Sequence, residues 1–465
     1  MPPNNPRSLC ASILAARNLS ACIDVGLGAR RSWGELAGEA AFAVRRAELQ
    51  QSSVVVATTG QLDAAAALIQ LDGTVRRMVL YPPDLSREHL DYVARLADAE
   101  WIVTDDPDLE SSNCNIERIV PRRGRSTNEG VDRGQKVETE WILLTSGTTG
   151  LPKLVKHTLA SLTGAISPHN PSSVPVVWST LYDIRRYGGL QIFLRAALTG
   201  TPLVLSDAHE SIAEYLSRAG VDGSTHISGT PSQWRRVLMS PSANKIAPAY
   251  VRLSGEIADQ AILNQLKSQY PEARVAHAFA STEAGVVLEV NDGVMGIPAN
   301  AIGHNPFVEM KLKDGTLRVR SSRTASGYLG QDSPPLRDGE GFVDTGDVLE
   351  LREDRYYFAG RRDGTINVGG LKVHPEEVEA VINRHPEVGM SLVRTRKSSI
   401  TGGLVVADVV LKSPKQPGED RTQALQREIL QICRAELALY KVPVGINFVS
   451  TLPVSQTGKL VRRHA

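Results

Sequence analysis

Residues 145–153, Thr-Ser-Gly-Thr-Thr-Gly-Leu-Pro-Lys, follow an apolar run and hold four hydroxyl side chains, two glycines and a lysine. This pattern predicts a strand that enters a tight loop. Glycines let backbone N–H groups turn toward a ligand, and the hydroxyls and Lys153 add donors and positive charge, which suits a polyphosphate. A Walker A loop joins Gly-Lys-Ser/Thr directly, whereas Leu151 and Pro152 separate Gly150 from Lys153. A plain surface loop of this composition is the alternative interpretation.

Five further motifs can serve the same nucleotide. After a predicted strand at Arg274–Ala278 comes Phe-Ala-Ser-Thr-Glu, ending at Glu283. A carboxylate there could hold Mg²⁺ on the phosphates, although a lone acid is more often a surface residue. Asp-Thr-Gly-Asp ends at Asp347, and a carboxylate on a glycine turn suits a ribose diol. An aspartic protease would need a second such triplet and an all-β chain, and the sequence has neither.

The last three motifs lie where the patterning changes. Gly360–Gly364 reads as a charged linker and a possible hinge. Val368–Glu377 contains a Gly-Gly pair, which lets a backbone approach a ligand closely. Lys459 lies on a glycine-containing loop near the C-terminus, where it could reach a ligand or simply be solvated.

The bulk composition is that of a globular protein that has several structural units. The chain has 465 residues, 42% hydrophobic and 22% charged, with a net charge of +1. This charge gives no bias toward nucleic acid or an acidic membrane. The four cysteines are scattered, no apolar run is long enough to span a bilayer, and the first residues lack the plan of a signal peptide. We therefore expect a cytoplasmic protein without nucleic-acid or membrane partners, either a monomer or a homodimer.

Strands that alternate with helices predict a layered α/β body up to about residue 290. We expect residues 1–30 to be irregular, and helices over residues 32–49 and 157–166. Short turn-bounded segments from Gly296 to Phe358 predict a small β-barrel-like subdomain. The remainder, after Gly360, reads as a separate α+β domain. The predicted fold class is thus α/β, with domains at 1–360 and 361–465.

Taken together, the six motifs resemble those of the acyl-adenylating superfamily, which includes acyl- and aryl-CoA synthetases, peptide-synthetase adenylation domains and luciferases. The resemblance covers essentially the whole chain, in the order and spacing of the family. It implies an ATP site, with a linker arginine at Arg361, a hinge at Asp363 and an adenylation lysine at Lys459. The other positions that it implies for the nucleotide, its Mg²⁺ and the thiol are Thr145, Ser146, Gly147, Thr148, Thr149, Gly150, Lys153, Phe279, Thr282, Glu283, Asp347, Gly369 and Gly370.

The resemblance implies that a carboxylic acid attacks Mg·ATP, releasing pyrophosphate and forming an acyl-adenylate. The smaller domain then swings about Asp363, and a thiol, most simply CoA, takes the acyl group. Transfer to a carrier-protein phosphopantetheine or to an amine, and adenylation without any thioester, stay open as alternatives. A non-catalytic nucleotide-binding protein of the same fold is a more remote one.

Three departures from the family's pattern matter. Phe279 replaces the usual tyrosine, which keeps ring stacking on adenine but loses a hydroxyl contact. Leu154 replaces a usual glycine, which we expect to be tolerated at a helix start. The acid-gate segment contains Arg185 and Arg186. Either could pair with the substrate carboxylate or with a second acid, or both could be solvated. The Trp and Tyr side chains suggest a compact acid, such as an aromatic one, rather than a long fatty chain. Near this acid we place Trp178, Tyr187, Gly188, Arg186, Ser228, Gly255 and Ala278.

Overall fold

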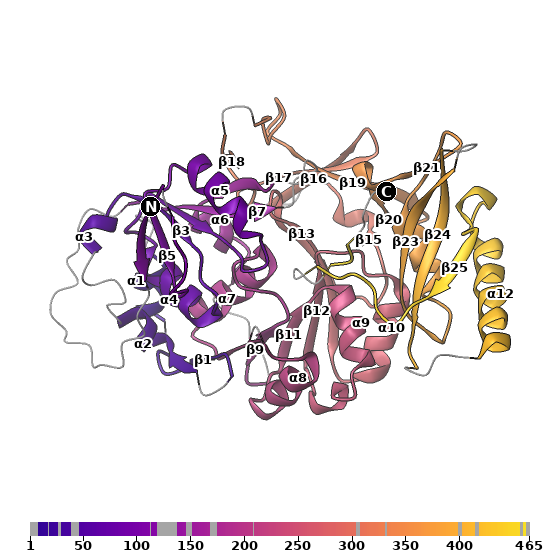
Figure 1. Cartoon of the computed structure of the whole chain (residues 1–465), viewed down its shortest axis with the longest axis horizontal. Coiled ribbons are helices and arrows are strands. Elements are labelled where there is room, and N and C mark those ends of the chain that lie inside the picture. The colour runs from indigo at the N-terminus through magenta and orange to yellow at the C-terminus, as the bar shows by residue number, and fades with distance from the viewer. Residues whose placement is uncertain are drawn as a thin grey trace.

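The computed structural model describes residues 8–16, 18–26, 29–38, 46–111, 113–118, 137–145, 151–167, 174–207, 209–303, 307–330, 333–398, 402–413, 418–455 and 459–461. A large N-terminal body occupies the left and centre of Figure 1, and a smaller C-terminal unit lies at its right. No helix among these residues is long and apolar enough to cross a bilayer.

A seven-stranded sheet forms the first layer of the body, in the order β18-β8-β7-β4-β3-β5-β6. Its core is parallel, whereas β8 runs antiparallel to β7 and β18 antiparallel to β8. The helices that accompany it are α4 (Gln61–Leu71) and α5 (Leu90–Leu96). The strands are β3 (Ser53–Val56), β4 (Arg77–Leu80), β5 (Trp101–Thr104), β6 (Asn115–Arg118), β7 (Glu140–Thr145), β8 (Lys153–His157) and β18 (Gly327–Tyr328).

An eight-stranded sheet forms the second layer, in the order β14-β13-β12-β11-β9-β10-β1-β2. Helix α7 (Tyr187–Thr199) packs in one core cluster with residues of both sheets, so it lies between them. The opposite face is covered by α8 (Ile212–Val221), α9 (Pro231–Met239) and α10 (Gln260–Gln269). The strands are β1 (Cys22–Asp24), β2 (Arg30–Ser32), β9 (Trp178–Thr180), β10 (Leu203–Leu205), β11 (His226–Gly229), β12 (Tyr250–Ser254), β13 (Arg274–Ser281) and β14 (Gly285–Val290).

A five-stranded sheet, in the order β15-β20-β19-β17-β16, forms the predicted β subdomain. All of its pairings are antiparallel, and it has its own apolar cluster. The strands are β15 (Ile297–Pro298), β16 (Val308–Lys313), β17 (Thr316–Ser321), β19 (Val343–Arg352) and β20 (Arg355–Arg361).

The C-terminal unit has a separate apolar core built from residues 366–448. Its elements are β21 (Ile366–Val368), β22 (Leu371–Val373), α11 (Pro375–Ile382), β23 (Val388–Ser398), β24 (Gly402–Leu411), α12 (Glu419–Glu436) and β25 (Gly445–Phe448). A polar contact joins it to the body, because Asn383 Nδ2 donates to Asp259 Oδ2 (3.1 Å) and Arg235 donates to both oxygens of Asp259. The α/β class with a β subdomain and an α+β unit is therefore confirmed, whereas the domain limits stay a prediction.

Two local predictions were wrong. Residues 1–30 are not irregular throughout, because α1 (Leu9–Leu14) packs on the body and β1 pairs with β10. Of the helix expected over 32–49, the structure describes α2 (Trp33–Gly38) and α3 (Arg46–Leu49), and residues 39–45 lie outside the described residues. Residues 153–157 form strand β8, so Leu154 lies in a strand, and the helix expected over 157–166 is the shorter α6 (Leu159–Thr163). Pairing with β7 makes this short apolar segment a strand. Periodicity alone cannot distinguish a strand from a helix over so few residues.

Candidate active site at the domain junction

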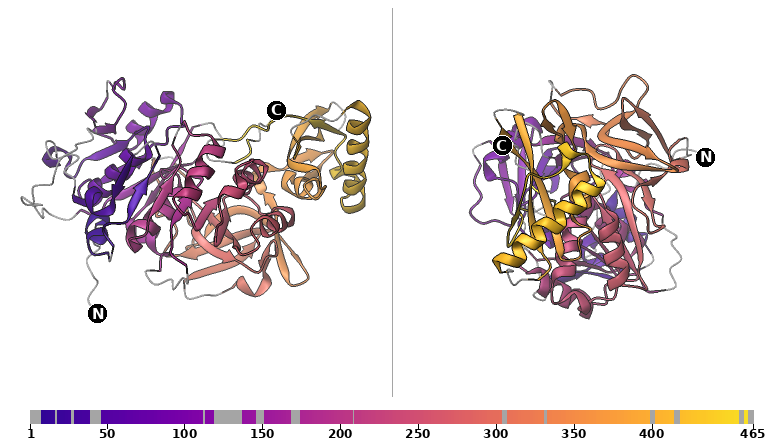
Figure 2. Two further views of the ribbon diagram at one scale, coloured as in Figure 1. Left: turned by 90° about the horizontal axis from the view of Figure 1, so that it is seen from below. Right: turned by 90° about the vertical axis from the view of Figure 1, so that its right-hand side faces the viewer.

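Lys459 comes to the body from the C-terminal unit. After β25 the chain runs back from that unit toward the body, as the yellow trace in Figure 2 shows. Lys459 keeps part of its surface exposed, and its side chain lies beside Gly255. A Cβ on Gly255 would come within 3.2 Å of Lys459 Cε, and Gly255 has a φ of +86°, which L-residues rarely adopt. This approach therefore requires glycine at position 255.

Lys459 is surrounded by charges from several other segments. Desolvation lowers the pKa of Lys459. The carboxylates of Glu256, Asp347 and Glu283 act in the opposite direction, and Arg361 adds to the lowering. Lys459 is thus within electrostatic reach of three other predicted site residues, Asp347, Glu283 and Arg361, which come from other segments of the chain.

Asp347 is a desolvated carboxylate at the edge of this cluster. It lies on β19 directly opposite Arg361 on β20, and the Arg361 guanidinium is 3.9 Å from its carboxylate. Burial raises the pKa of Asp347 to about 6, against the influence of Arg361 and of Thr345. Such a carboxylate has lone pairs available to accept hydrogen bonds from two hydroxyl groups.

Glu283 lies in the turn between β13 and β14, next to residues that follow the predicted phosphate loop. Tyr328 Oη lies 3.4 Å from Glu283 Oε1, and the Lys153 ammonium lies 5.6 Å from the centre of the Tyr328 ring. Thr145 and Lys153 are register partners in β7 and β8. The segment between them is therefore the connection of a hairpin whose base lies beside Glu283.

His157 fixes the turn that carries Thr282 and Glu283, and no sequence pattern indicated this contact. Its Nε2 donates to the Thr282 carbonyl oxygen at 2.7 Å, and its Nδ1 lies 2.9 Å from Ser161 Oγ. Burial lowers the pKa of His157 to about 4, so the ring is neutral near pH 7. From the sequence, we expected His157 to begin a helix. Its contact with Thr282, far along the chain, was therefore not predicted.

Glu256 joins the C-terminal segment to the body. Its Oε1 accepts from the backbone N–H of Leu460 at 2.9 Å, and its Oε2 accepts from the N–H of Ser232 at 2.9 Å. The residue next to Lys459 is therefore held by a carboxylate of the body. The sequence shows Glu256 only as an acid after a strand, so this role was missed.

Phe279 packs against a neighbouring ring. The Phe279 and Phe358 rings are stacked, with centroids 5.1 Å apart and planes at 28°. Both rings pack at the edge of the β-subdomain core. Phe358 thus holds Phe279 in place at the end of β13.

The residues predicted near the acid line the α7 face of the eight-stranded sheet. Trp178 and Tyr187 are buried, and the ring of Tyr182 lies 3.2 Å from where a Cβ on Gly188 would stand. Tyr182 Oη donates to the Ser254 carbonyl oxygen at 2.6 Å. Ser228 lies on β11 and Ala278 on β13, and Gly255 directly follows β12, which lies between these two strands.

Neither arginine of the gate segment is solvated. Arg185 is buried, and its guanidinium donates to Asp183 and to the carbonyl oxygens of Thr58 and Thr59. These contacts fix a loop. The expectation that Arg185 meets substrate or solvent is therefore wrong. Arg186 pairs with Asp84 at 2.6 Å. Its Nη1 also lies 3.3 Å from the Leu144 carbonyl oxygen, at the entrance of the phosphate loop.

The remaining predicted residues are placed elsewhere. Ser146, Gly147, Thr148, Thr149 and Gly150 lie outside the described residues. Gly369 and Gly370 form an exposed turn between β21 and β22, and no described atom lies within 4 Å of a Cβ built on either. Asp363 is exposed in a short 3₁₀ turn after β20.

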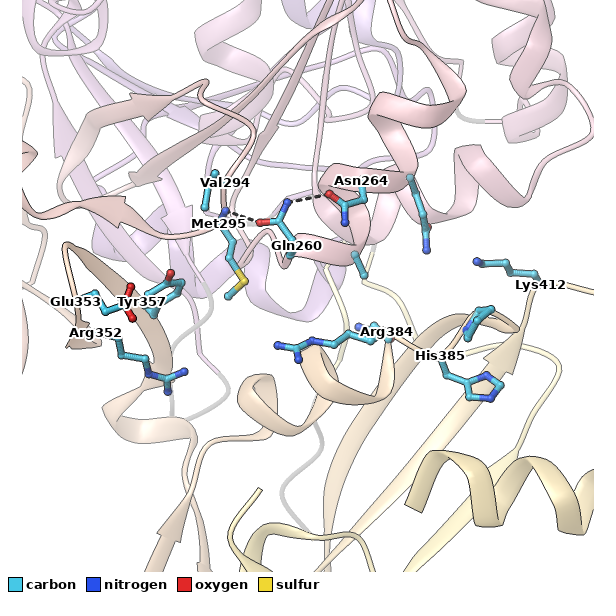
Figure 3. A pocket seen from close by; sticks show the side chains of 14 residues that line it. Gln260, Asn264, Val294, Met295, Arg352, Glu353, Tyr357, Arg384, His385 and Lys412 are labelled. Carbon is cyan, nitrogen blue, oxygen red and sulfur yellow. Dashed lines mark hydrogen bonds between the residues drawn. The ribbon is translucent and has the colours of Figure 1, made fainter. Parts of the chain in front are cut away.

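A pocket of about 680 Å³ opens at the junction between α10 and the start of the C-terminal unit. Figure 3 shows Gln260 and Asn264 on the body side and Arg384 and His385 on the other. None of the predicted site residues lines it. It is therefore separate from the cluster around Lys459.

Sequence comparisons match this arrangement to a known family. The profile of the AMP-binding enzyme family matches residues 49–329, and that of its C-terminal domain matches residues 377–459. The chain belongs to the AMP-binding enzyme family. The two matches cover both sides of the junction at which Lys459, Asp347 and Glu283 meet.

Curated relatives of this family are CoA ligases. The chain is 28% identical over 71% of its length to the acyl-CoA ligase ppsA of Aspergillus oryzae, of which the match covers 63%. It is 29% identical over 65% of its length to a 2-succinylbenzoate–CoA ligase of Salmonella typhimurium, of which the match covers 62%. The chain thus matches somewhat less than two thirds of the length of these relatives.

Solved structures share the fold of this family member over nearly its whole length. An anthranilate CoA ligase in complex with anthranoyl-AMP has a TM-score of 0.81 at 19% identity, covering 98% of this chain and 95% of that one. An amide bond synthetase from Marinactinospora thermotolerans has a TM-score of 0.78 at 19% identity, covering 97% of each chain.

Proposed function

We propose that the protein activates a compact carboxylic acid with ATP as an acyl-adenylate, releases pyrophosphate, and then transfers the acyl group to a thiol, with CoA as the first candidate. The observation that carries this proposal is the position of Lys459, which the C-terminal unit places beside Gly255 and among Asp347, Glu283 and Arg361. A reaction between a carboxylate and the phosphates of ATP joins two anions, so it requires a cation. Lys459 supplies this cation from the C-terminal unit. The family membership and the CoA-ligase relatives support the same conclusion.

The chemistry brings a substrate carboxylate to the α-phosphate of ATP, so negative charge must be neutralised. We assign that task to the Lys459 ammonium, together with Lys153 and the hydroxyl and N–H groups of residues 145–150. Asp347 accepts hydrogen bonds from the ribose hydroxyls, and Phe279, held by Phe358, lies against the adenine. Thr282 and Arg361 complete the nucleotide site in this proposal.

Mg²⁺ fits the groups around Glu283. Among the described residues no three His, Cys, Asp or Glu side chains gather into a metal cage. Mg²⁺ usually takes only one or two protein carboxylates, with phosphate oxygens and water as its other ligands. Glu283, with Thr145 nearby in the hairpin base, would hold it, and the ion would neutralise phosphate charge.

The thiol step needs a second arrangement of the two units. Gly369 and Gly370 are exposed, whereas Lys459 is at the junction, and in this proposal that arrangement serves adenylation. We infer that the C-terminal unit rotates about Asp363, withdraws Lys459 and brings the Gly369–Gly370 turn to the adenylate. The exposed position of Asp363 on a short turn supports this movement.

Acid-dependent exchange of labelled pyrophosphate into ATP tests this function. We expect no exchange without acid and a clear signal with at least one compact acid. Addition of CoA, a carrier protein or an amine then identifies the acceptor by the product formed. Exchange that is absent with every acid, although ATP binds, would reject the proposal in favour of a nucleotide-binding protein.

A further inference from the structure

The two faces of the eight-stranded sheet carry different side chains. On the face covered by α8, α9 and α10, residues such as Ile227, Val251 and Val275 form an apolar cluster. This is the usual composition of parallel strands that are buried under helices. Along each strand, the residues between these apolar ones point to the opposite face, which α7 covers. On that face the neighbouring strands β11 and β12 carry polar side chains, which are His226, Ser228, Tyr250, Arg252 and Ser254.

The register arranges these side chains in three levels across the sheet. Ser254 is level with Ala278, and it directly precedes Gly255, beside which Lys459 lies. One step further from Lys459, Ser228 is level with Arg252. The last level is an aromatic row of Trp178, His226 and Tyr250, whose neighbouring rings have centroids 5.0 and 5.4 Å apart.

Two arginines bring an excess of positive charge to this face. Arg252 is only 6% exposed, and its Nε lies 3.3 Å from Glu289 Oε2. Arg195, on α7, lies 5.7 Å from the centre of the Trp178 ring, and desolvation followed by the charge of Arg252 lowers its pKa. Among the described residues, Glu289 is the one carboxylate within ion-pair distance of Arg252, and it is shared with Arg274 at 3.6 Å. Buried charge without full compensation is costly, so a stable protein keeps it where it has a use.

Ser228 gives an independent sign of a ligand at the same place. Ser228 is fully buried, and its hydroxyl has no hydrogen-bond partner among the described residues. Strand alternation and register direct it to the α7 face, next to Arg252. Buried hydroxyl groups are nearly always paired, so an unpaired one beside an arginine indicates a missing acceptor.

We propose that the acid substrate carries a second acidic group, a carboxylate, and that Arg252 binds it together with Ser228 and Arg195. This inference rests on the proposed function, and it specifies that the acid substrate is a dicarboxylic acid. Arg252 precedes Gly255 by three residues, which is about 10 Å along a strand. One carboxylate of a compact dicarboxylic acid can therefore lie at Lys459 while the other lies at Arg252, with the aromatic row closing the far end.

The test compares dicarboxylic acids with their neutral partners in the pyrophosphate-exchange assay. A series of aliphatic and phenyl-linked dicarboxylates of increasing length is measured against the monoamide of each, which has the same shape without the second charge. For the best acid we expect kcat/KM of the wild-type protein to favour the dicarboxylate by at least about 10²-fold, since an unpaired buried arginine is costly.

Three variants locate this preference. Arg252→Met should remove it, and Ser228→Ala should reduce it by about 10-fold. Arg236→Met is the matched control, because Arg236 is exposed on α9 on the other side of the sheet. ATP affinity and thermal unfolding show whether each variant is folded. If Arg252→Met does not fold, Arg195→Met, whose arginine is less buried, should reduce the preference in the same direction.

The outcomes separate this inference from the function on which it rests. A dicarboxylate preference that Arg252→Met removes supports it. Exchange with monocarboxylates and no preference for any dicarboxylate, or a preference that survives in Arg252→Met, overturns it and leaves the adenylation proposal intact. Failure of every acid to support exchange, with ATP bound, overturns both.

Discussion

The nucleotide end and the acid end of the candidate site are assembled in different ways. At the nucleotide end, Lys459, Asp347 and Glu283 come from segments far apart, and one of them belongs to the other structural unit. At the acid end, Ser228 and Arg252 are neighbours in adjacent strands of one sheet. The comparison indicates that the nucleotide end depends on how the two units are arranged, whereas the acid end depends on strand register within the body.

Loss of Lys459 should have the largest effect, and it should be the same for every acid. Lys459→Ala removes the cation supplied by the C-terminal unit, and we expect adenylation to fall by about 10²–10³. Transfer to a thiol from a preformed adenylate should be largely unchanged. Single-turnover measurement of the two half-reactions checks this, with Lys245→Ala, an exposed lysine of the body, as the control. Equal losses in both half-reactions would contradict the assignment.

Stiffening the hinge should affect only the second half-reaction. In Asp363→Pro the backbone at the turn after β20 loses a rotation, so adenylate formation should persist while thiol transfer falls by about 10²-fold or more. Rapid-quench measurement of adenylate and thioester separates the two steps. Overall turnover equal to wild type would show that rotation at Asp363 is not needed.

Removing the charge of Glu256 should loosen the junction without changing the acid end. Glu256→Gln weakens the charge-assisted bonds to the N–H groups of Leu460 and Ser232. We expect kcat of adenylation to fall by about 10-fold, with the ranking of acids unchanged. A changed ranking of acids would place Glu256 at the acid end instead.

The smallest effect concerns stability and its pH dependence. Burial raises the pKa of Asp347 to about 6. An unfolded aspartate has its pKa near 3.9, so between these values the unfolded chain loses its proton first, and the charged carboxylate destabilises the folded state at higher pH. Asp347→Asn should therefore raise the free energy of unfolding by roughly 1–3 kcal/mol above pH 6, with the gain shrinking toward pH 4.

Denaturant unfolding of both proteins at several pH values measures this difference. A gain independent of pH, or a loss of stability above pH 6, would contradict the assigned pKa. We also expect the variant to bind ATP more weakly, because a functional carboxylate is often kept at the expense of stability.

The sequence predicted the two ends to different degrees. Short strings such as Asp-Thr-Gly-Asp around Asp347 and the run before Lys153 have glycine and polar residues in a fixed local order, so they can be found without a structure. The alternation of strands and helices before residue 290 and the short β segments between Gly296 and Phe358 were also predicted, because turn residues bound their apolar runs, whereas β18 was not predicted.

The residues that were missed act through contacts between distant segments. His157 meets Thr282 only because Lys153–His157 pairs as a strand with β7. Arg252 would ordinarily be read as a break in an apolar strand, and its place beside Ser228 follows from parallel register. Arg185 resembles a ligand-binding residue in the sequence, yet its partners are a neighbouring aspartate and a loop of the first sheet. Local patterns do not contain this information.

Pyrophosphate exchange by Lys459→Ala and Arg252→Met, measured over one panel of mono- and dicarboxylic acids, tests the account most directly. We predict acid-dependent exchange in the wild-type protein, a uniform loss for all acids in Lys459→Ala, and a changed ranking of acids in Arg252→Met. Exchange by Lys459→Ala at the wild-type rate, or the absence of acid-dependent exchange in the wild-type protein, would contradict it.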